Sequence, residues 1–115
     1  MKSLYPADGS GPTVSTTEIG SDFGSRVTLL QFSSAFCSPC RATKALLADI
    51  TADLPDVRHI NIDAESNLEL VRRLDIRSTP TTLILNGNGV EVGRAVGAPK
   101  RDQVIAALVG VAPIK

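Results

Sequence analysis

Two cysteines, Cys37 and Cys40, are the residues of this 115-residue sequence best placed to do chemistry. They follow an apolar run, Val27–Phe32, that is typical of a strand buried on both faces, and a helical pattern opens at Cys40. Cys37 therefore stands where a strand gives way to a helix. Unpaired N–H groups and the positive end of the helix dipole favour an anion at that point, such as a thiolate. The pattern predicts a site of dithiol–disulfide exchange.

The two cysteines are expected to play different parts in such an exchange. A thiolate attacks a disulfide sulfur, and a second thiol then resolves the mixed disulfide. We expect Cys37, at the helix tip and exposed, to attack, and Cys40, one turn in and more buried, to resolve. Two intervening residues allow the sulfurs to reach bonding distance. Pro39 lacks an N–H group, so it fits the first helical turn and stiffens the loop.

Two other readings of the cysteine pair stay open. The pair could form an inert disulfide, although a bridge closing so small a loop gives little entropic stabilisation. It could also be half of a zinc site, which normally needs four ligands. His59 is the only histidine and the only other soft ligand that the chain offers. We therefore expect no metal and no other cofactor.

The segment around the cysteines resembles the active-site segment of the thioredoxin family. The residues that carry the resemblance are Phe32, Ala35, Phe36, Pro39, Cys40 and Arg41, followed by the later landmarks Asn61–Asp63, Thr79–Thr81 and Val96–Ala98. The similarity covers roughly residues 26–109. It implies an α/β, thioredoxin-like fold in which helices flank a central mixed β-sheet.

The same resemblance implies further site residues. Thr79–Pro80 is similar to the family's cis-proline turn, which would leave the Thr79 backbone free to pair with an extended substrate; an ordinary trans turn is the alternative. Gly97 would let a substrate backbone approach closely, or would simply end a strand. Phe36 stands where the family usually has tryptophan, and would either line the site with apolar surface or belong to the core.

Several positions depart from the family pattern. Gln31 replaces a buried aspartate, and an amide cannot relay a proton. His59 stands near the position of a family lysine; it could serve as a proton shuttle or be an ordinary half-exposed strand histidine. Ser33 replaces a tryptophan, which predicts a more open site. Ser38 replaces a frequent glycine and is expected to change the redox potential.

Length and composition indicate one soluble globular domain. Twelve basic and twelve acidic residues cancel, which argues against a nucleic-acid partner. Residues 1–13 are interpreted as a flexible leader, rich in Pro, Gly and Ser from Tyr5 onward, and residues 14–115 as the thioredoxin-like domain. The chain shows no signal peptide or membrane-length apolar run, so the cytoplasm is the expected compartment. The alternative is an extracytoplasmic domain whose upstream membrane anchor was removed.

Hydrophobic periodicity and turn residues predict the elements along the chain. In order they are a strand at Val14–Glu18, a loop at Ile19–Arg26, a strand at Val27–Phe32, a helix at Cys40–Leu54, a strand at Val57–Ile62, a helix from Ser66 with a Ser66/Glu69 capping box, a strand at Thr81–Leu85, a turn at Asn86–Gly89, a strand at Val90–Val96 and a last helix with Pro99 in its first turn. The helix from Ser66 is expected to present the stripe Leu68, Val71 and Leu74, and the last helix carries Val104, Ile105, Leu108 and Val109. The basic cluster Arg72, Arg73 and Arg77 is interpreted as a solvated face without a role.

The predicted function is that of a monomeric thiol–disulfide oxidoreductase that reduces protein disulfides. Its partners would be disulfide-bearing proteins and an upstream electron donor, such as thioredoxin reductase or a membrane dithiol donor. A binding or scaffold module that keeps the fold, with slow thiols, is the competing hypothesis.

Overall fold

A four-stranded sheet forms the centre of the protein in a computed structural model that describes residues 11–112. Its strands are β1 (Val27–Ser33), β2 (Val57–Asp63), β3 (Thr81–Asn86) and β4 (Glu91–Val96), in the spatial order β2-β1-β3-β4. β1 runs parallel to β2 and antiparallel to β3, and β3 runs antiparallel to β4. The predicted α/β architecture, a mixed sheet flanked by helices, is confirmed.

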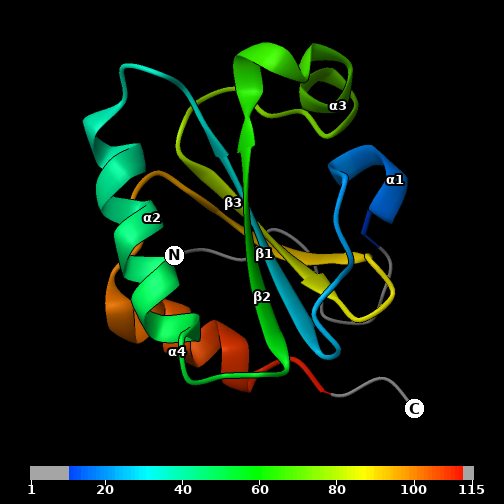
Figure 1. The fold of residues 1–115 in the computed structure, drawn as a ribbon, viewed down its shortest axis with the longest axis vertical. Coiled ribbons are helices and arrows are strands. Elements are labelled where there is room, and N and C mark those ends of the chain that lie inside the picture. The colour runs from blue at the N-terminus through cyan, green and yellow to red at the C-terminus, as the bar shows by residue number, and fades with distance from the viewer. Residues whose placement is uncertain (1–10, 113–115) are drawn as a thin grey trace.

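Helices cover both faces of this sheet (Figure 1). One face carries α2 (Ser38–Thr51) and α4 (Arg101–Val109); the other carries α1 (Thr16–Ile19), the 3₁₀ turn η1 (Ala64–Ser66) and α3 (Leu68–Arg73). Each face has its own apolar cluster. The α2/α4 side buries Val27, Leu29, Leu47, Val57, Ile84, Val92, Val104, Leu108 and Val111, and the α1/α3 side buries Val14, Ile19, Leu30, Phe32, Ile62, Leu70, Leu74, Ile76, Leu83 and Leu85.

The strand β1 is an interior strand of the sheet and is buried on both faces, as the apolar run predicted. Its first six residues are all buried, because alternate side chains enter the two clusters. The helix α2 begins at Ser38, two residues before the predicted start, with Cys37 as its N-cap. Pro39 lies in its first turn, where its missing N–H costs no hydrogen bond. Helix and strand together bring the two cysteines to one end of the sheet.

The prediction of an edge strand at Val14–Glu18 is wrong. Residues 16–19 form the short helix α1, closed by a capping box in which the Glu18 N–H donates to Ser15 Oγ and the Ser15 N–H donates to Glu18 Oε1. The strand-like contact lies just before it, where Thr13 forms an isolated antiparallel bridge with Val90. β-branched residues misled the prediction, and the Ser-x-x-Glu signal was overlooked. Residues 1–10 of the proposed leader lie outside the described residues, whereas Pro12 and Thr13 already bond to the sheet edge.

The capping box predicted at Ser66 and Glu69 is also absent. Ser66 Oγ donates to Asp63 Oδ2, and Asp63 caps η1 instead. α3 begins at Leu68 with Asn67 as its N-cap residue, and the side chain of Asn67 makes no capping hydrogen bond. Consequently Leu68 is half exposed, and Leu70 takes its place beside Leu74 in the core.

The last helix begins later than predicted. Lys100 is the N-cap of α4, so Pro99 lies before the helix. Val104 and Leu108 are buried as expected, whereas Ile105 and Val109 face solvent. No helix among residues 11–112 is long and apolar enough to span a membrane.

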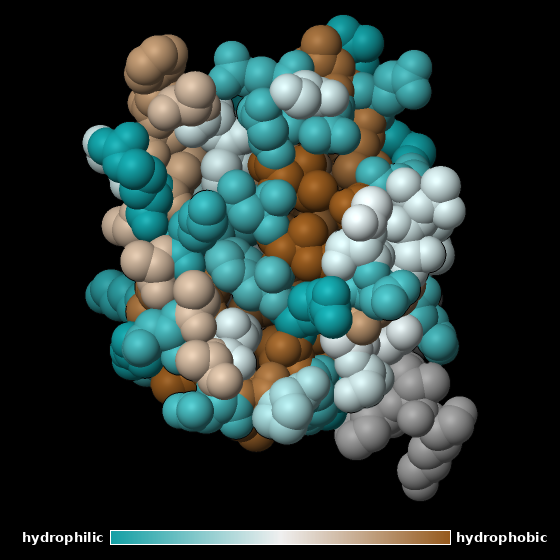
Figure 2. All heavy atoms as spheres, viewed as in Figure 1, coloured by the Kyte–Doolittle hydropathy of each residue, from teal (hydrophilic) through white to brown (hydrophobic). Residues whose placement is uncertain are grey.

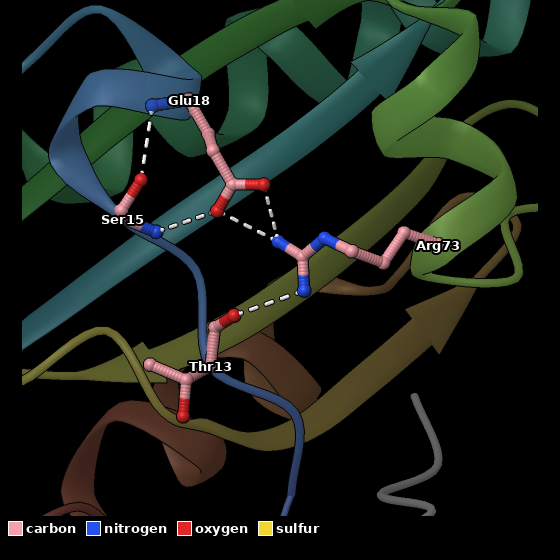
Figure 3. Close-up of polar contacts among 4 residues, drawn as sticks. All are labelled: Thr13, Ser15, Glu18 and Arg73. Atoms are coloured by element: carbon pink, nitrogen blue, oxygen red, sulfur yellow. Dashed lines mark hydrogen bonds and ion pairs between the residues drawn. The ribbon is translucent and has the colours of Figure 1, made fainter.

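Arg73, one of the arginines interpreted as solvated, links α3 to residues 13–18 of the N-terminal segment by hydrogen bonds and an ion pair (Figure 3). Its guanidinium donates to both carboxylate oxygens of Glu18, at 2.7 and 2.6 Å, and to the Thr13 carbonyl at 3.1 Å. Arg73 of α3 thus bonds both to the capping-box glutamate of α1 and to Thr13, which bridges to Val90 just before β4. The interpretation of Arg73 as a residue without a role is therefore wrong.

Candidate active site

Cys37 and Cys40 are joined by a disulfide bond at the N-terminus of α2, with their Cα atoms 5.2 Å apart. As the N-cap residue, Cys37 points its sulfur at the unpaired N–H groups of the first turn, and the Cys40 N–H donates to Cys37 Sγ at 3.1 Å. After reduction the same N–H and the helix dipole would stabilise a thiolate on Cys37. The geometry thus gives the two sulfurs unequal surroundings.

The burial of the two sulfurs follows the predicted order but not the predicted degree. Cys40 is 3% exposed and Cys37 8% exposed, so the expectation that Cys37 is an exposed residue is wrong for the oxidised protein. Phe36, immediately before it, is fully exposed and Ser38 and Pro39 are exposed as well. The core reading of Phe36 is thereby excluded. Its ring is apolar surface available beside the disulfide.

Gln31 connects the central strand to the first turn of α2. It is fully buried, and its Nε2 donates to the Cys40 carbonyl at 2.9 Å and to Ser33 Oγ at 3.0 Å. Ser33 Oγ in turn donates to Asn61 Oδ1 at 2.8 Å. These acceptors fix which end of the amide faces α2. Gln31 therefore bonds directly to the main chain of Cys40, although its amide cannot take up a proton.

His59 meets the other end of the same amide, with Nε2 3.0 Å from Gln31 Oε1. Because Gln31 Oε1 can only accept, His59 carries its proton on Nε2. Burial lowers the pKa of His59 below its ordinary 6.5, and the nearby Lys44 ammonium lowers that pKa further. The imidazole is consequently neutral near pH 7. The structure thus brings Gln31, His59 and Cys40 into one hydrogen-bonded chain.

The predicted substrate-binding residues form a second group. Thr79 lies beside the cysteine loop, its Oγ1 3.0 Å from Ser34 Oγ. The Thr79–Pro80 peptide bond is cis, as the resemblance implied. Gly97 donates its N–H to the Pro80 carbonyl at 2.9 Å and has φ +90, a conformation that L side chains rarely adopt. The backbone at Gly97 therefore lies beside the proline turn, with open space where a side chain would be.

Sequence reasoning missed the polar residues that fix this loop. The Ala35 N–H donates to Glu65 Oε1 at 3.2 Å, and Ser34 bonds to Thr79 as described. Glu65 lies two residues after the end of β2, in η1. The parallel strands β1 and β2 end at the same side of the sheet, which is the signal that could have placed Glu65 beside Ala35. Within residues 11–112, no group of three or more His, Cys, Asp or Glu side chains is arranged to hold a metal ion.

A family model named Thioredoxin matches residues 16–109, most of the chain. The chain belongs to the thioredoxin family. Among curated thioredoxins, Thioredoxin H5 of Oryza sativa subsp. japonica is 33% identical over 77 residues, which cover 67% of this chain and 56% of that protein. The thioredoxin of Chlamydia trachomatis serovar D is 32% identical over 80% of this chain and 89% of its own length.

Solved thioredoxin structures share the fold. Spinach chloroplast thioredoxin F (short form) superposes with a TM-score of 0.65 at 31% identity, covering 75% of this chain and 76% of its own. A thioredoxin from Nicotiana alata gives a TM-score of 0.66 at 26% identity, over 74% and 72% of the two chains. The match spans only 56% of the length of the rice Thioredoxin H5 and 64% of the length of the rice Thioredoxin H4-1.

Proposed function

We propose that Cys37 and Cys40 form a dithiol that reduces disulfide bonds in proteins. The observation that carries the proposal is the position of Cys37 Sγ at the N-cap of a 14-residue helix, where it accepts the Cys40 N–H and is bonded to Cys40. Membership of the thioredoxin family supports a thiol–disulfide oxidoreductase in general. Reduction, rather than oxidation, of the substrate is part of the proposal.

The reaction begins with the reduced dithiol. The Cys37 thiolate attacks one sulfur of a substrate disulfide, a mixed disulfide forms, and the other substrate sulfur leaves as a thiolate that takes up a proton. Cys40 then loses its proton and attacks Cys37 Sγ, which releases the second substrate thiol. Two electrons pass to the substrate, and the chain is left with the Cys37–Cys40 bond. An external dithiol donor must reduce that bond again; thioredoxin reductase or a membrane dithiol donor would serve.

The surrounding residues have supporting roles in this proposal. Phe36 offers an apolar contact to the substrate beside Cys37, and its full exposure supports that role. Thr79, Pro80 and Gly97 would receive the extended backbone of the substrate. Gln31 would hold Cys40 in place.

A scaffold function with slow thiols is the second candidate, favoured by Gln31, which replaces a titratable group with an amide. The two candidates differ in the reactivity of Cys37. The rate of Cys37 alkylation against pH should show a thiol that ionises below the ordinary value of about 8.5 if the chain is a reductase. Ionisation near that value would favour the scaffold.

The direct test is reduction of insulin by the chain with a dithiol donor. Cys37→Ser should abolish reduction, and Cys40→Ser should accumulate a mixed disulfide with the substrate. Undiminished reduction by Cys37→Ser would overturn the proposal. A reduction potential near −270 mV would indicate a reductant, and one near −120 mV an oxidant, on the scale of known dithiol proteins.

The compartment and assembly belong to the same proposal. We place the chain in the cytoplasm as a monomer, and the alternative is an extracytoplasmic domain tethered to a membrane. Codons upstream of Met1 that encode an apolar span would favour the tethered form.

A further inference from the structure

One edge of the sheet, at β4, is covered by another segment of the chain, and the other edge, at β2, is not covered by any strand among residues 11–112. At the β4 edge, the Glu91 N–H donates to the Pro12 carbonyl at 2.7 Å and the Val14 N–H donates to the Gly89 carbonyl at 2.8 Å. Thr13, between them, bridges to Val90. The segment 12–14 therefore covers that edge. In the part of the chain that the structure describes, no strand covers β2 at the opposite edge.

The hydrogen bonds of β1 show which groups of β2 point outward. Val27 pairs with Val57 in a parallel register, and its N–H donates to the Asp56 carbonyl. In a parallel ladder one residue bonds to the two residues that flank its partner. The even-numbered residues of β2 thus direct their main-chain groups toward β1, and the odd-numbered residues direct theirs away from the sheet.

The outward-facing groups in the middle of β2 belong to His59 and Asn61. At the two ends of the strand, the Val57 N–H donates to the Leu54 carbonyl and Asn67 Nδ2 donates to the Asp63 carbonyl. Between them, the main-chain N–H and C=O groups of His59 and Asn61 have no partner among residues 11–112. Such a row of free groups is a template for an added strand.

The surface beside this edge is a groove that could accept an extended peptide. A groove of about 480 Å³ runs beside the first half of β2, between the 23–25 loop and the C-terminal half of α2, and it is lined by Phe23, Ala48, Thr51, Val57 and His59 among others. Figure 2 views the same side as Figure 1 and shows apolar atoms between polar side chains in the middle of this face.

Basic side chains flank the middle of the strand on both faces. His59 shares its face with Val57, which packs under α2, and the exposed Lys44 of α2 is close enough to affect His59. Arg58 projects from the opposite face and donates to Ser21 Oγ. A strand added beside β2 would place the side chain opposite His59 near Lys44, so an acidic residue there would be complementary.

We propose that the outer edge of β2 binds an extended segment of another protein by strand addition, with an acidic side chain of that segment opposite His59. The proposal does not depend on turnover at Cys37, because strand addition uses the outward main-chain groups of β2 and its test measures binding rather than reduction. A second copy of the chain would be a different occupant, and the test distinguishes it.

Hydrogen exchange tests the edge with an internal control. In the free protein, the amides of His59 and Asn61 should exchange fast and those of Ile60 and Ile62 slowly, because only the latter bond to β1. The probe is the peptide acetyl-Thr-Val-Thr-Glu-Thr-Val-Thr-amide, titrated to about 5 mM because a single added strand binds weakly. We expect exchange at His59 and Asn61 to slow by about tenfold at saturation. Unchanged exchange at both amides would overturn the proposal.

Two pairs of variants test the chemistry of binding. Lys44→Glu, an exposed substitution that should not affect folding, should weaken binding of the Glu peptide by about fivefold and favour a peptide with Lys in its place. Asn61→Pro removes an outward N–H without touching the β1 ladder, whereas Asn61→Ala keeps it. Only Asn61→Pro should lose peptide binding.

The remaining outcomes would contradict the proposal. Equal affinity of the Lys44→Glu protein for the two peptides would overturn the charge preference. Protection of His59 and Asn61 that rises with protein concentration alone, together with dimers in sedimentation, would assign the edge to a second copy instead.

Discussion

The Nε2 atom of His59 donates a hydrogen bond to the side-chain oxygen of Gln31, and the amide nitrogen of Gln31 donates to the carbonyl of Cys40. A buried amide therefore stands between His59 and Cys40, the cysteine proposed to resolve the mixed disulfide. Because an amide does not titrate, a proton cannot pass along this chain, yet the position of Cys40 depends on it. Gln31 and His59 are accordingly expected to position Cys40 rather than to relay its proton.

Gln31→Glu should destabilise the protein although it preserves the shape of the side chain. The donor to the Cys40 carbonyl becomes an acceptor, and a fully buried carboxylate faces that carbonyl. We expect a loss of about 1–3 kcal/mol in the free energy of unfolding, measured by urea denaturation of the oxidised protein. Gln31→Met, which removes both hydrogen-bonding ends, is the control. Equal stability of Gln31→Glu and the parent would contradict the proposed role of the amide.

His59→Asn should slow release of the mixed disulfide. The substitution removes the hydrogen bond to Gln31 Oε1, so Gln31 positions Cys40 less firmly. A hydrogen bond is worth about 0.5–1.5 kcal/mol, and a barrier raised by that amount corresponds to a rate lower by roughly twofold to tenfold. Rapid-quench measurement of the mixed disulfide across pH 6 to 8 would detect it. Kinetics identical to those of the parent at every pH would remove His59 from the mechanism.

The stability of the folded protein should fall as the pH drops below 6.5, and His59 should be the cause. Burial and Lys44 lower the pKa of His59 in the folded state. Between the folded pKa and 6.5, the unfolded chain therefore binds more protons at His59 than the folded chain does, and the free energy of unfolding falls as the pH falls. The loss begins near 6.5 and continues until the folded pKa is reached. Thermal unfolding of the parent and His59→Asn between pH 7 and 5 would measure it. The variant should lack this slope.

The buried pair Glu91–Arg94 should be intolerant of single substitution. Glu91 is fully buried and Arg94 is 5% exposed, with Nε and Nη2 donating to the carboxylate at 2.7 and 2.8 Å and Nη2 also donating to the Leu74 carbonyl. Arg94→Met leaves a buried charge unpaired and should cost about 3–5 kcal/mol, seen in denaturant unfolding. The double variant Glu91→Leu/Arg94→Met should recover much of that loss. A double variant worse than both single ones would refute this account.

Glu18→Gln tests the ion pair between Glu18 and Arg73, which holds the N-terminal segment against α3. A hydrogen bond from the Ser15 backbone, opposed in part by burial, and the Arg73 guanidinium lower the pKa of Glu18. Its stabilisation is therefore present above the ordinary 4.5 and is lost as the pH falls through the folded pKa. Both side chains are partly exposed, so we expect about 0.5–1 kcal/mol at pH 7 and none at low pH. A loss that persists unchanged at low pH would exclude the charge.

The sequence was sufficient for the parts of this protein that depend on local pattern. The buried run of β1, the helix start at the cysteines and the turn before Gly89 follow from periodicity and residue type. The link from Gln31 to Cys40 and the bridge from Thr13 to Val90 join residues far apart in the chain, so only the assembled sheet reveals them. The error at Ser66 has a local cause, since Asp63 competes for the same hydroxyl.

The bridge between Thr13 and Val90 has a practical meaning for shortened forms of the chain. A fragment that begins at Glu18 would lose the residues that shield β4, and with β2 already uncovered it would present bare backbone on two opposite sides. Molecules with two such sides can join end to end without limit. A chain without its first seventeen residues is therefore expected to assemble into filaments, which sedimentation alongside the full chain would detect.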